Sequence, residues 1–200
     1  MTNVLVTINE DSDDAHDTIS GFPGYVDGTS IIYGSEDTFR IYVSGVVFNG
    51  LNIPAGATID SATVAFIDND FGSGGDVGPL TIFAGDVDSN ALGYNSSAAG
   101  PADRATTTAS DSWTVNVGST GTATTPQLID QFQEIVNSYG AIVSADVLIH
   151  GDTSIGFNRD FKAFNDSPDS AATLNLDYTA GAGGGDTHTF RGLMTMGVGR

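Results

Sequence analysis

The chain contains no cysteine and only one lysine, Lys162, among its 200 residues. The absence of cysteine excludes disulfide bonds, thiolate metal sites and a cysteine nucleophile. The chain has 6 Lys and Arg residues against 25 Asp and Glu residues, which gives a formal net charge of -19. Nucleic acids and anionic membrane surfaces are polyanions that bind basic surfaces, so this charge argues against both as direct partners.

Long apolar segments are also absent. No run approaches the roughly 20 apolar residues of a membrane span. The N-terminal residues Met1 to Val4 lack the basic and apolar regions of a signal peptide, so we expect no export by that route. The hydrophobic content of 40% is nevertheless too high for a disordered acidic tail, and the length suits one domain with a core.

The residues that are abundant favour β-structure. Glutamate occurs only at positions 10, 36 and 134, whereas aspartate, glycine, threonine and serine, which prefer turns and strand surfaces to helices, are common. Alternating or continuous apolar residues predict at least seven short strands. We therefore predict an all-β, jelly-roll-like antiparallel β-sandwich over residues 1–179. The predicted strands are Val4–Ile8, Phe39–Phe48, Ala62–Phe66, Leu80–Ala84, Trp113–Val117, Val147–Ile149 and Leu174–Tyr178.

One segment has the pattern of a helix. Thr125 is a good N-cap, Pro126 suits the first helical position, and Gly140 suits the C-terminal stop. Between them, apolar residues recur at the i, i+3, i+4, i+7 spacing of a single buried stripe. We predict one helix over residues 126–139 that packs on the sheets through Leu128, Ile129, Phe132, Ile135, Val136 and Tyr139.

The C-terminal residues differ from the rest of the chain. Residues 180–185 are rich in glycine and predict a flexible linker. Residues 186–200 combine apolar side chains with two of the six basic residues. We expect these residues, called the C-terminal arm below, to bind another subunit by strand addition and apolar contacts. The residues expected to make this contact are Phe190, Arg191, Leu193, Met194, Met196, Val198 and Arg200.

A calcium site is one candidate for function. Asp68, Asp70 and Asp76 offer carboxylates on a glycine-rich loop, which suits Ca²⁺, although their spacing departs from an EF-hand. The alternative is a solvated hairpin loop in which Asp and Gly serve the turn. The acidic residues between Glu10 and Asp17 present the same alternatives, and a solvated run of charge is the more common case. The sequence requires no cofactor, and Ca²⁺ is the candidate ion.

Signals for catalysis are weak. His16, His150 and His188 are far apart in the sequence, and no Gly-x-Ser-x-Gly motif accompanies them. The remaining catalytic alternative is a glycan-degrading enzyme, which would need a pair of carboxylates facing each other across a groove. We therefore expect a protein that is not an enzyme.

Aromatic residues are candidates for ligand binding. Tyr25, Tyr33 and Tyr94 are expected in loops, where their rings would suit contact with a surface ligand such as a glycan. Trp113 alternates with two valines and is expected to face the core instead.

Much of residues 39–178 resembles the DNRLRE-type β-sandwich domains of bacterial and archaeal surface proteins. The resemblance is sharpest in the run Ile53-Pro54-Ala55-Gly56-Ala57-Thr58-Ile59-Asp60-Ser61-Ala62-Thr63-Val64. It extends to Phe39-Arg40-Ile41-Tyr42, Trp113-Thr114-Val115, Ile135-Val136-Asn137, Ser167-Pro168 and the closing strand Leu174–Tyr178. The resemblance implies a non-catalytic module that is related in architecture to carbohydrate-binding modules.

The ending Phe190-Arg191-Gly192-Leu193-Met194 is similar to the ends of phage structural proteins. With the missing export signal, it implies a structural protein of a tailed-virus particle that is assembled in the host cytoplasm. Such a protein would be exposed on the virion, as a head decoration or in a tail or fibre complex. Its implied partners are copies of itself, with a trimer as the first expectation, and virion proteins such as the major capsid or a tail protein. The alternative is a carbohydrate-binding module that recognises surface glycans, and the two functions are compatible.

Overall fold

The computed structural model describes residues 1–18, 30–37, 40–72, 76–86, 93–94, 100–116, 121–152 and 157–181. All pairings between the named strands are antiparallel. The strands lie in two layers around one large apolar core, so the predicted β-sandwich is confirmed.

The elements follow one another along the chain with one α-helix among the strands. They are β1 (Thr2–Thr7), the 3-10 helix η1 (Asp11–Asp13), β2 (Asp14–Thr18), β3 (Ser30–Asp37), β4 (Arg40–Ile53), β5 (Thr58–Gly72), β6 (Val77–Ala84), the 3-10 helix η2 (Pro101–Asp103), β7 (Asp111–Val115), β8 (Thr122–Thr124), α1 (Ile129–Tyr139), β9 (Ile142–His150), β10 (Asn158–Lys162), the 3-10 helix η3 (Pro168–Ser170) and β11 (Thr173–Thr179).

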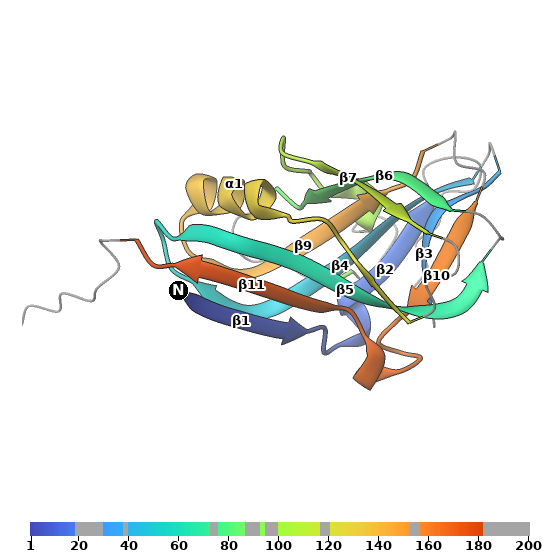
Figure 1. Ribbon diagram of the computed structural model, residues 1–200, viewed down its shortest axis with the longest axis horizontal. Helices are drawn as coiled ribbons and strands as arrows, with labels where there is room; N and C mark the ends of the chain where they lie inside the picture. Colours follow the sequence, from blue (N-terminus) through green and yellow to red (C-terminus); the bar gives the residue numbers. More distant parts are fainter. Residues whose placement is uncertain are drawn as a thin grey trace, which may run out of the picture.

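The two layers are joined at one end. The first layer contains β1, β11, β5 and β8, and the second contains β2, β4, β9, β6 and β7. Strands β10 and β3 connect them, because β10 pairs with both β5 and β3 while β3 pairs with β4. Figure 1 shows β1, β11 and β5 lying across β9, β4 and β2, with β10 toward the end away from α1.

The core lies between the layers and follows the alternation of the strands. Ala62, Val64 and Phe66 of β5 point inward and are 0%, 0% and 1% exposed, as the sequence predicts. Aromatic rings pack at the centre with ring centroids 4.9 to 6.2 Å apart. This group, called the aromatic cluster, consists of Tyr33, Phe66, Trp113 and Phe161.

Side chains rather than a strand cover part of one edge of β5. Thr125 Oγ1 accepts a hydrogen bond of 2.9 Å from the backbone N–H of Val64, and Gln127 Oε1 accepts one of 3.0 Å from Ala62. The side chain of Gln133 continues this pattern near the start of β5. These contacts satisfy the backbone groups that an uncovered edge would leave open.

Helix α1 starts later than the sequence predicts. Thr125 and Pro126 lie outside the helix, because the chain follows β5 there before the first helical turn begins at Ile129. Gly140 ends the helix with a φ of 85°, as predicted. The buried side of α1 packs against β5, β6 and β9.

Among the described residues, no helix has the length and apolar character needed to cross a membrane.

All seven predicted strand segments overlap observed strands, but four observed strands were not predicted. Strand β2 lies in a segment expected to be a loop, because its sequence Asp-Ala-His-Asp-Thr shows no apolar alternation. Strands β3, β8 and β10 are short or polar and lack that pattern as well.

Strand β11 lies between β1 and β5 and ends at Thr179. The described chain continues only to Gly181. The C-terminal arm and residues 182–185 of the predicted linker therefore lie outside the described residues.

Candidate functional site

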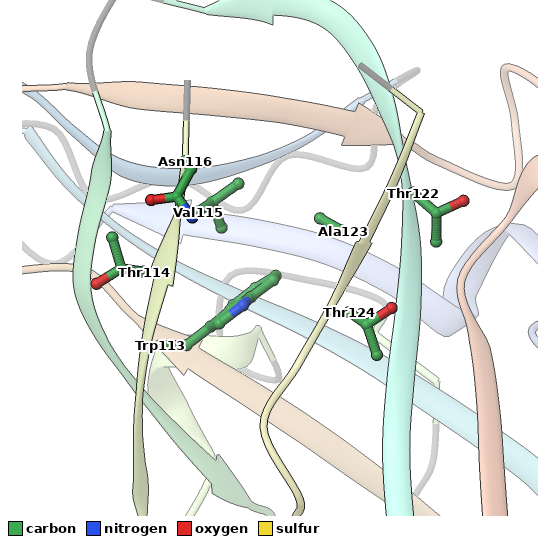
Figure 2. A pocket seen from close by; sticks show the side chains of 7 residues that line it. All are labelled: Trp113, Thr114, Val115, Asn116, Thr122, Ala123 and Thr124. Atoms are coloured by element: carbon green, nitrogen blue, oxygen red, sulfur yellow. The ribbon is translucent and has the colours of Figure 1, made fainter. Parts of the chain in front are cut away.

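The candidate binding site is a small pocket between β7 and β8, on one open side of the sandwich. Strand β7 pairs with β6 and strand β8 pairs with β5, so the two strands that flank the pocket are not paired with each other. Figure 2 shows the indole of Trp113 between the two strands, with Ala123 directed toward it and Thr114 and Thr124 directed away. The pocket has a volume of about 180 Å³ and is lined by Trp113, Thr114, Val115, Asn116, Thr122, Ala123 and Thr124.

Packing in the aromatic cluster places Trp113 at the floor of this pocket. Its ring stacks on that of Phe161, with the centroids 6.1 Å apart and 13° between the planes. Trp113 is 7% exposed, which confirms that it faces the core. The pocket therefore meets only a small part of the indole, and most of the ring stabilises the core.

The pocket offers only uncharged polar groups. None of the seven lining residues carries an ionisable side chain. The polar groups that it offers are hydroxyls, one side-chain amide and the backbone of two strand edges, which bind uncharged polar ligands through hydrogen bonds. Its volume lies below the roughly 300–1,000 Å³ of typical small-molecule sites, so it suits part of a ligand rather than a whole one.

A second polar group of residues lies on the outer face of the second layer. Asp146 of β9 is 0% exposed, and its Oδ2 atom lies 3.7 Å from Nη1 of Arg104. The guanidinium of Arg104 in turn lies 4.8 Å from the centre of the Tyr94 ring. Burial raises the pKa of Asp146 to about 6, although the positive charge of Arg104 opposes the shift. Burial also raises the pKa of the Tyr94 phenol, and the nearby charge of Asp146 adds to this effect.

Two glycines leave room for the buried side chains of Asp146 and Tyr94. A Cβ atom at Gly85 would lie 1.7 Å from Oδ1 of Asp146, and one at Gly45 would lie 2.0 Å from the Tyr94 hydroxyl. Tyr94 also packs with Leu148 and other apolar residues of this face. The connection between β6 and β7 is thus fastened to the layer, and this group of residues is part of the fold rather than a ligand site.

The two described histidines lie in different surroundings. His16 is 5% exposed and its ring packs edge-on against Tyr42, with centroids 5.6 Å apart. Burial lowers the pKa of His16 to about 4. His150 packs against Phe83 at 5.0 Å, and burial lowers its pKa too. Burial thus disfavours the charged form of both rings, and His188 lies outside the described residues.

The predicted calcium ligands do not form a common site in the described structure. Asp68 is 7% exposed, and its Oδ2 accepts a hydrogen bond of 2.5 Å from Nη2 of Arg159. This corrects the expectation for Asp68, because the guanidinium already neutralises its charge. Asp76 is exposed before β6, and the side chain of Asp70 lies outside the described residues. The described part of the chain contains no group of three or more His, Asp or Glu residues that could hold a metal.

The expectation of surface tyrosines is also corrected. Tyr33 lies in β3 rather than a loop and is 1% exposed, because it belongs to the aromatic cluster. Tyr94 is 0% exposed because it covers Gly45. Neither ring can serve as a surface platform, and Tyr25 lies outside the described residues.

The acidic segment between Glu10 and Asp17 is not a solvated run. Asp13, Asp14 and Asp17 are 1%, 1% and 5% exposed. Oδ1 of Asp13 accepts a hydrogen bond of 3.0 Å from Asn49, and Asp14 accepts one of 2.7 Å from the backbone N–H of Phe164. Asp13 thus joins η1 to β4, and Asp14 joins the start of β2 to the segment after β10. Burial raises the pKa of Asp13.

The described chain is thus an antiparallel β-sandwich with a small uncharged pocket at one side. A scan against protein-family models finds no match, and a search of curated proteins finds none either. Among solved structures, the chain is similar to TmCBM61, described in complex with beta-1,4-galactotriose. The TM-score is 0.29 at 12% sequence identity, and the match covers 88% of this chain and 82% of that chain. A match with a TM-score this low supports no inference about function. The resemblance to DNRLRE-type and phage proteins stays a prediction.

Proposed function

We propose that the protein is a non-enzymatic structural protein of a tailed-virus particle, exposed on the virion as a head decoration or in a tail or fibre complex. The observation that carries the proposal is the position of β11. This strand pairs on both sides and ends at Thr179, so the described strands form a core without residues 182–200. We expect the C-terminal arm to anchor the sandwich to a neighbouring subunit.

The distribution of charge supports the same function. The whole chain has a net charge of -19, whereas the C-terminal arm contains Arg191 and Arg200 and only one acidic residue, Asp186. An arm with basic and apolar residues is attracted to acidic copies of the same sandwich. The acidic exterior in turn keeps assembled copies soluble.

The site supports a role without catalysis. The pocket between β7 and β8 has no ionisable side chain, and burial disfavours the charged form of both described histidines. The best-formed cluster of charged residues, around Asp146, fastens the fold.

Removal of residues 182–200 tests the anchoring role. The truncated chain keeps every described strand, so we expect it to fold and to lose the contacts that the C-terminal arm makes with neighbouring subunits. Light scattering would give the molar mass of both forms, and mass spectrometry of purified particles would report incorporation. The matched control is a full-length chain in which residues 186–200 are shuffled, which keeps length and composition. Incorporation of the truncated or shuffled chain at the level of the natural one would contradict the proposal.

A second candidate function is glycan binding, favoured by the position of Trp113 at the floor of an uncharged polar pocket. Aromatic rings stack on the apolar faces of sugars, while backbone and hydroxyl groups bind sugar hydroxyls. Trp113 is the single tryptophan of the chain, so its fluorescence reports directly on this pocket.

Titration with mono- and oligosaccharides tests glycan binding. A bound sugar should shift the emission of Trp113, and Ala123→Leu, at a side chain directed toward the indole, should abolish the effect of that sugar by filling the pocket. Val143→Leu, on an exposed position of β9, is the control for a substitution outside the pocket. No shift with any member of a broad glycan panel would exclude this second function.

A further inference from the structure

Strand β1 is an edge of the first layer in the described part of the chain. It pairs with β11 on one side, and no described residue forms a hydrogen bond with its other side. Its residues alternate between exposed and half-buried, and Leu5 is 68% exposed. A row of open N–H and C=O groups of this kind is a template for pairing with another strand.

The other edges in the described part of the chain are protected. The edge of β5 is covered by β8 and by the side chains of Thr125 and Gln127. Strand β2 is buried along nearly its whole length, and β7 lies beside β8 across the pocket. Proteins commonly protect exposed edges with lysine, proline or a bulge. Strand β1, with the sequence Thr-Asn-Val-Leu-Val-Thr, has none of these devices.

The charge around β1 permits contact between two copies. Copies with a net charge of -19 repel each other, so a contact between them needs a surface with few charges. Residues Asn3, Leu5 and Thr7 face outward opposite Asp177, Asn175 and Thr173 of β11, and Asp177 is the one charged residue among these six. Its carboxylate accepts hydrogen bonds of 2.9 Å from Asn3 and from Ser61, which favour its ionised form and lower its pKa. Leu5, at the centre of this row, has no charged residue opposite it.

Geometry restricts the register of such a contact. Residues that face each other across an antiparallel pair point to the same side of the sheet, so a two-fold pairing of β1 must be centred on a residue. Centring on Leu5 buries two exposed leucines against each other and sets Val4 against Val6 on the core side. Centring on Val4 would set Leu5 against Asn3 and bury less apolar surface.

We propose that two copies of the chain pair through β1 in an antiparallel two-fold contact, with Leu5 opposite Leu5 of the partner subunit. The first layers of the two sandwiches then form one continuous sheet. The contact is only six residues long, so we expect a dimer that dissociates on dilution. It does not depend on the C-terminal arm, and it favours an even-numbered assembly over the trimer expected from the sequence.

The absence of cysteine makes a cross-linking test direct. In the proposed register the two Cα atoms at position 5 lie about 4.5–5.5 Å apart, which suits a disulfide. Those at position 3 lie about 13 Å apart, because each is four residues from its own partner position. Mild oxidation should therefore convert Leu5→Cys into a covalent dimer, and leave Asn3→Cys and the control Val143→Cys monomeric. Equal cross-linking of all three variants, or none of Leu5→Cys, would overturn the proposal.

A charge variant gives an independent measurement. Leu5→Asp places two carboxylates opposite each other at the centre of the contact, which should weaken dimerisation by at least about tenfold. Val143→Asp places the same charge at an exposed position of β9, in the second layer and outside the proposed contact, and should dimerise normally. Light scattering over a dilution series measures the dimerisation of both variants.

The chain that ends at Gly181 should still dimerise if β1 is the contact, so failure of this proposal is distinct from failure of the anchoring function. Normal dimerisation of Leu5→Asp would contradict the β1 contact.

Discussion

Arg159 of β10 donates a hydrogen bond of 2.5 Å to Asp68 of β5, and only 11% and 2% of the two side chains are exposed. The pair lies where β10 connects the two layers, so it stabilises the end at which the sandwich is joined. A carboxylate that would suit a cation site by its sequence is thus part of a buried ion pair.

Arg159→Met should destabilise the protein strongly. The change leaves the buried carboxylate of Asp68 without its cation, and breaking a buried pair on one side costs about 3–5 kcal/mol. Urea denaturation would measure the loss in the free energy of unfolding. The double variant Asp68→Asn with Arg159→Met removes the uncompensated charge and should recover much of the stability. A loss below about 1 kcal/mol in the single variant would show that the pair contributes like an exposed one.

Asp146→Asn should change how stability depends on pH. The pKa of Asp146 is about 6 in the folded protein, against an ordinary value of 3.8, so folding binds a proton between these values. The stability from this group is complete below about pH 4 and is lost as the pH rises through 6. The free energy of unfolding of the natural protein should fall by up to about 3 kcal/mol relative to Asp146→Asn between pH 4 and pH 7. Parallel pH profiles of the two proteins would contradict this assignment.

His16 should make stability depend on pH in the opposite direction to Asp146. Its pKa is about 4 in the folded protein against 6.5 ordinarily, so the unfolded chain binds a proton first as the pH falls. Its contribution to stability is complete above about pH 6.5 and is lost toward pH 4. Relative to His16→Gln, the natural protein should lose up to about 3 kcal/mol between pH 7 and pH 4. An NMR titration of the ring should give a midpoint near pH 4, and a midpoint near 6.5 would refute the burial argument.

Gly85→Ala should destabilise the connection between β6 and β7. The new methyl group would meet Oδ1 of Asp146 at 1.7 Å, and such overpacking costs typically about 1–3 kcal/mol. Gly50→Ala is the control for backbone strain alone, because no atom lies within 4 Å of its Cβ although its φ is +77°. Urea denaturation should rank Gly85→Ala as the less stable variant. If the two variants are equally stable, the space around Asp146 is not restrictive.

Local patterns predict the parts of the fold in which one side of an element is buried. The alternation in β5 placed Ala62, Val64 and Phe66 in the core, and the apolar spacing after residue 128 placed α1 on the sheets. Strand β2 escaped prediction because both of its sides are buried and four of its five residues are polar, so its sequence carries no apolar alternation. The start of α1 was misjudged because Thr125 bonds to β5, a contact between residues distant in the sequence.

The candidate sites were less predictable than the fold. Tyr94 is in a long connection rich in small residues, which is typical of an exposed loop, and its packing against Gly45 and the apolar residues of the second layer buries it. The pocket at Trp113 is formed by β7 and β8, which are near in sequence but belong to different layers. The single tryptophan on a short strand was the one signal that pointed to this place.

The sequence by itself determined an all-β sandwich with one packed helix, because the period of apolar residues follows from which side of each element is buried. It also determined the acidic charge and the absence of cysteine chemistry. Tertiary structure decided which carboxylates are ion-paired or buried, where the pocket opens and which strand edge no described residue covers. These properties depend on contacts between residues far apart in the chain, which local periodicity does not encode.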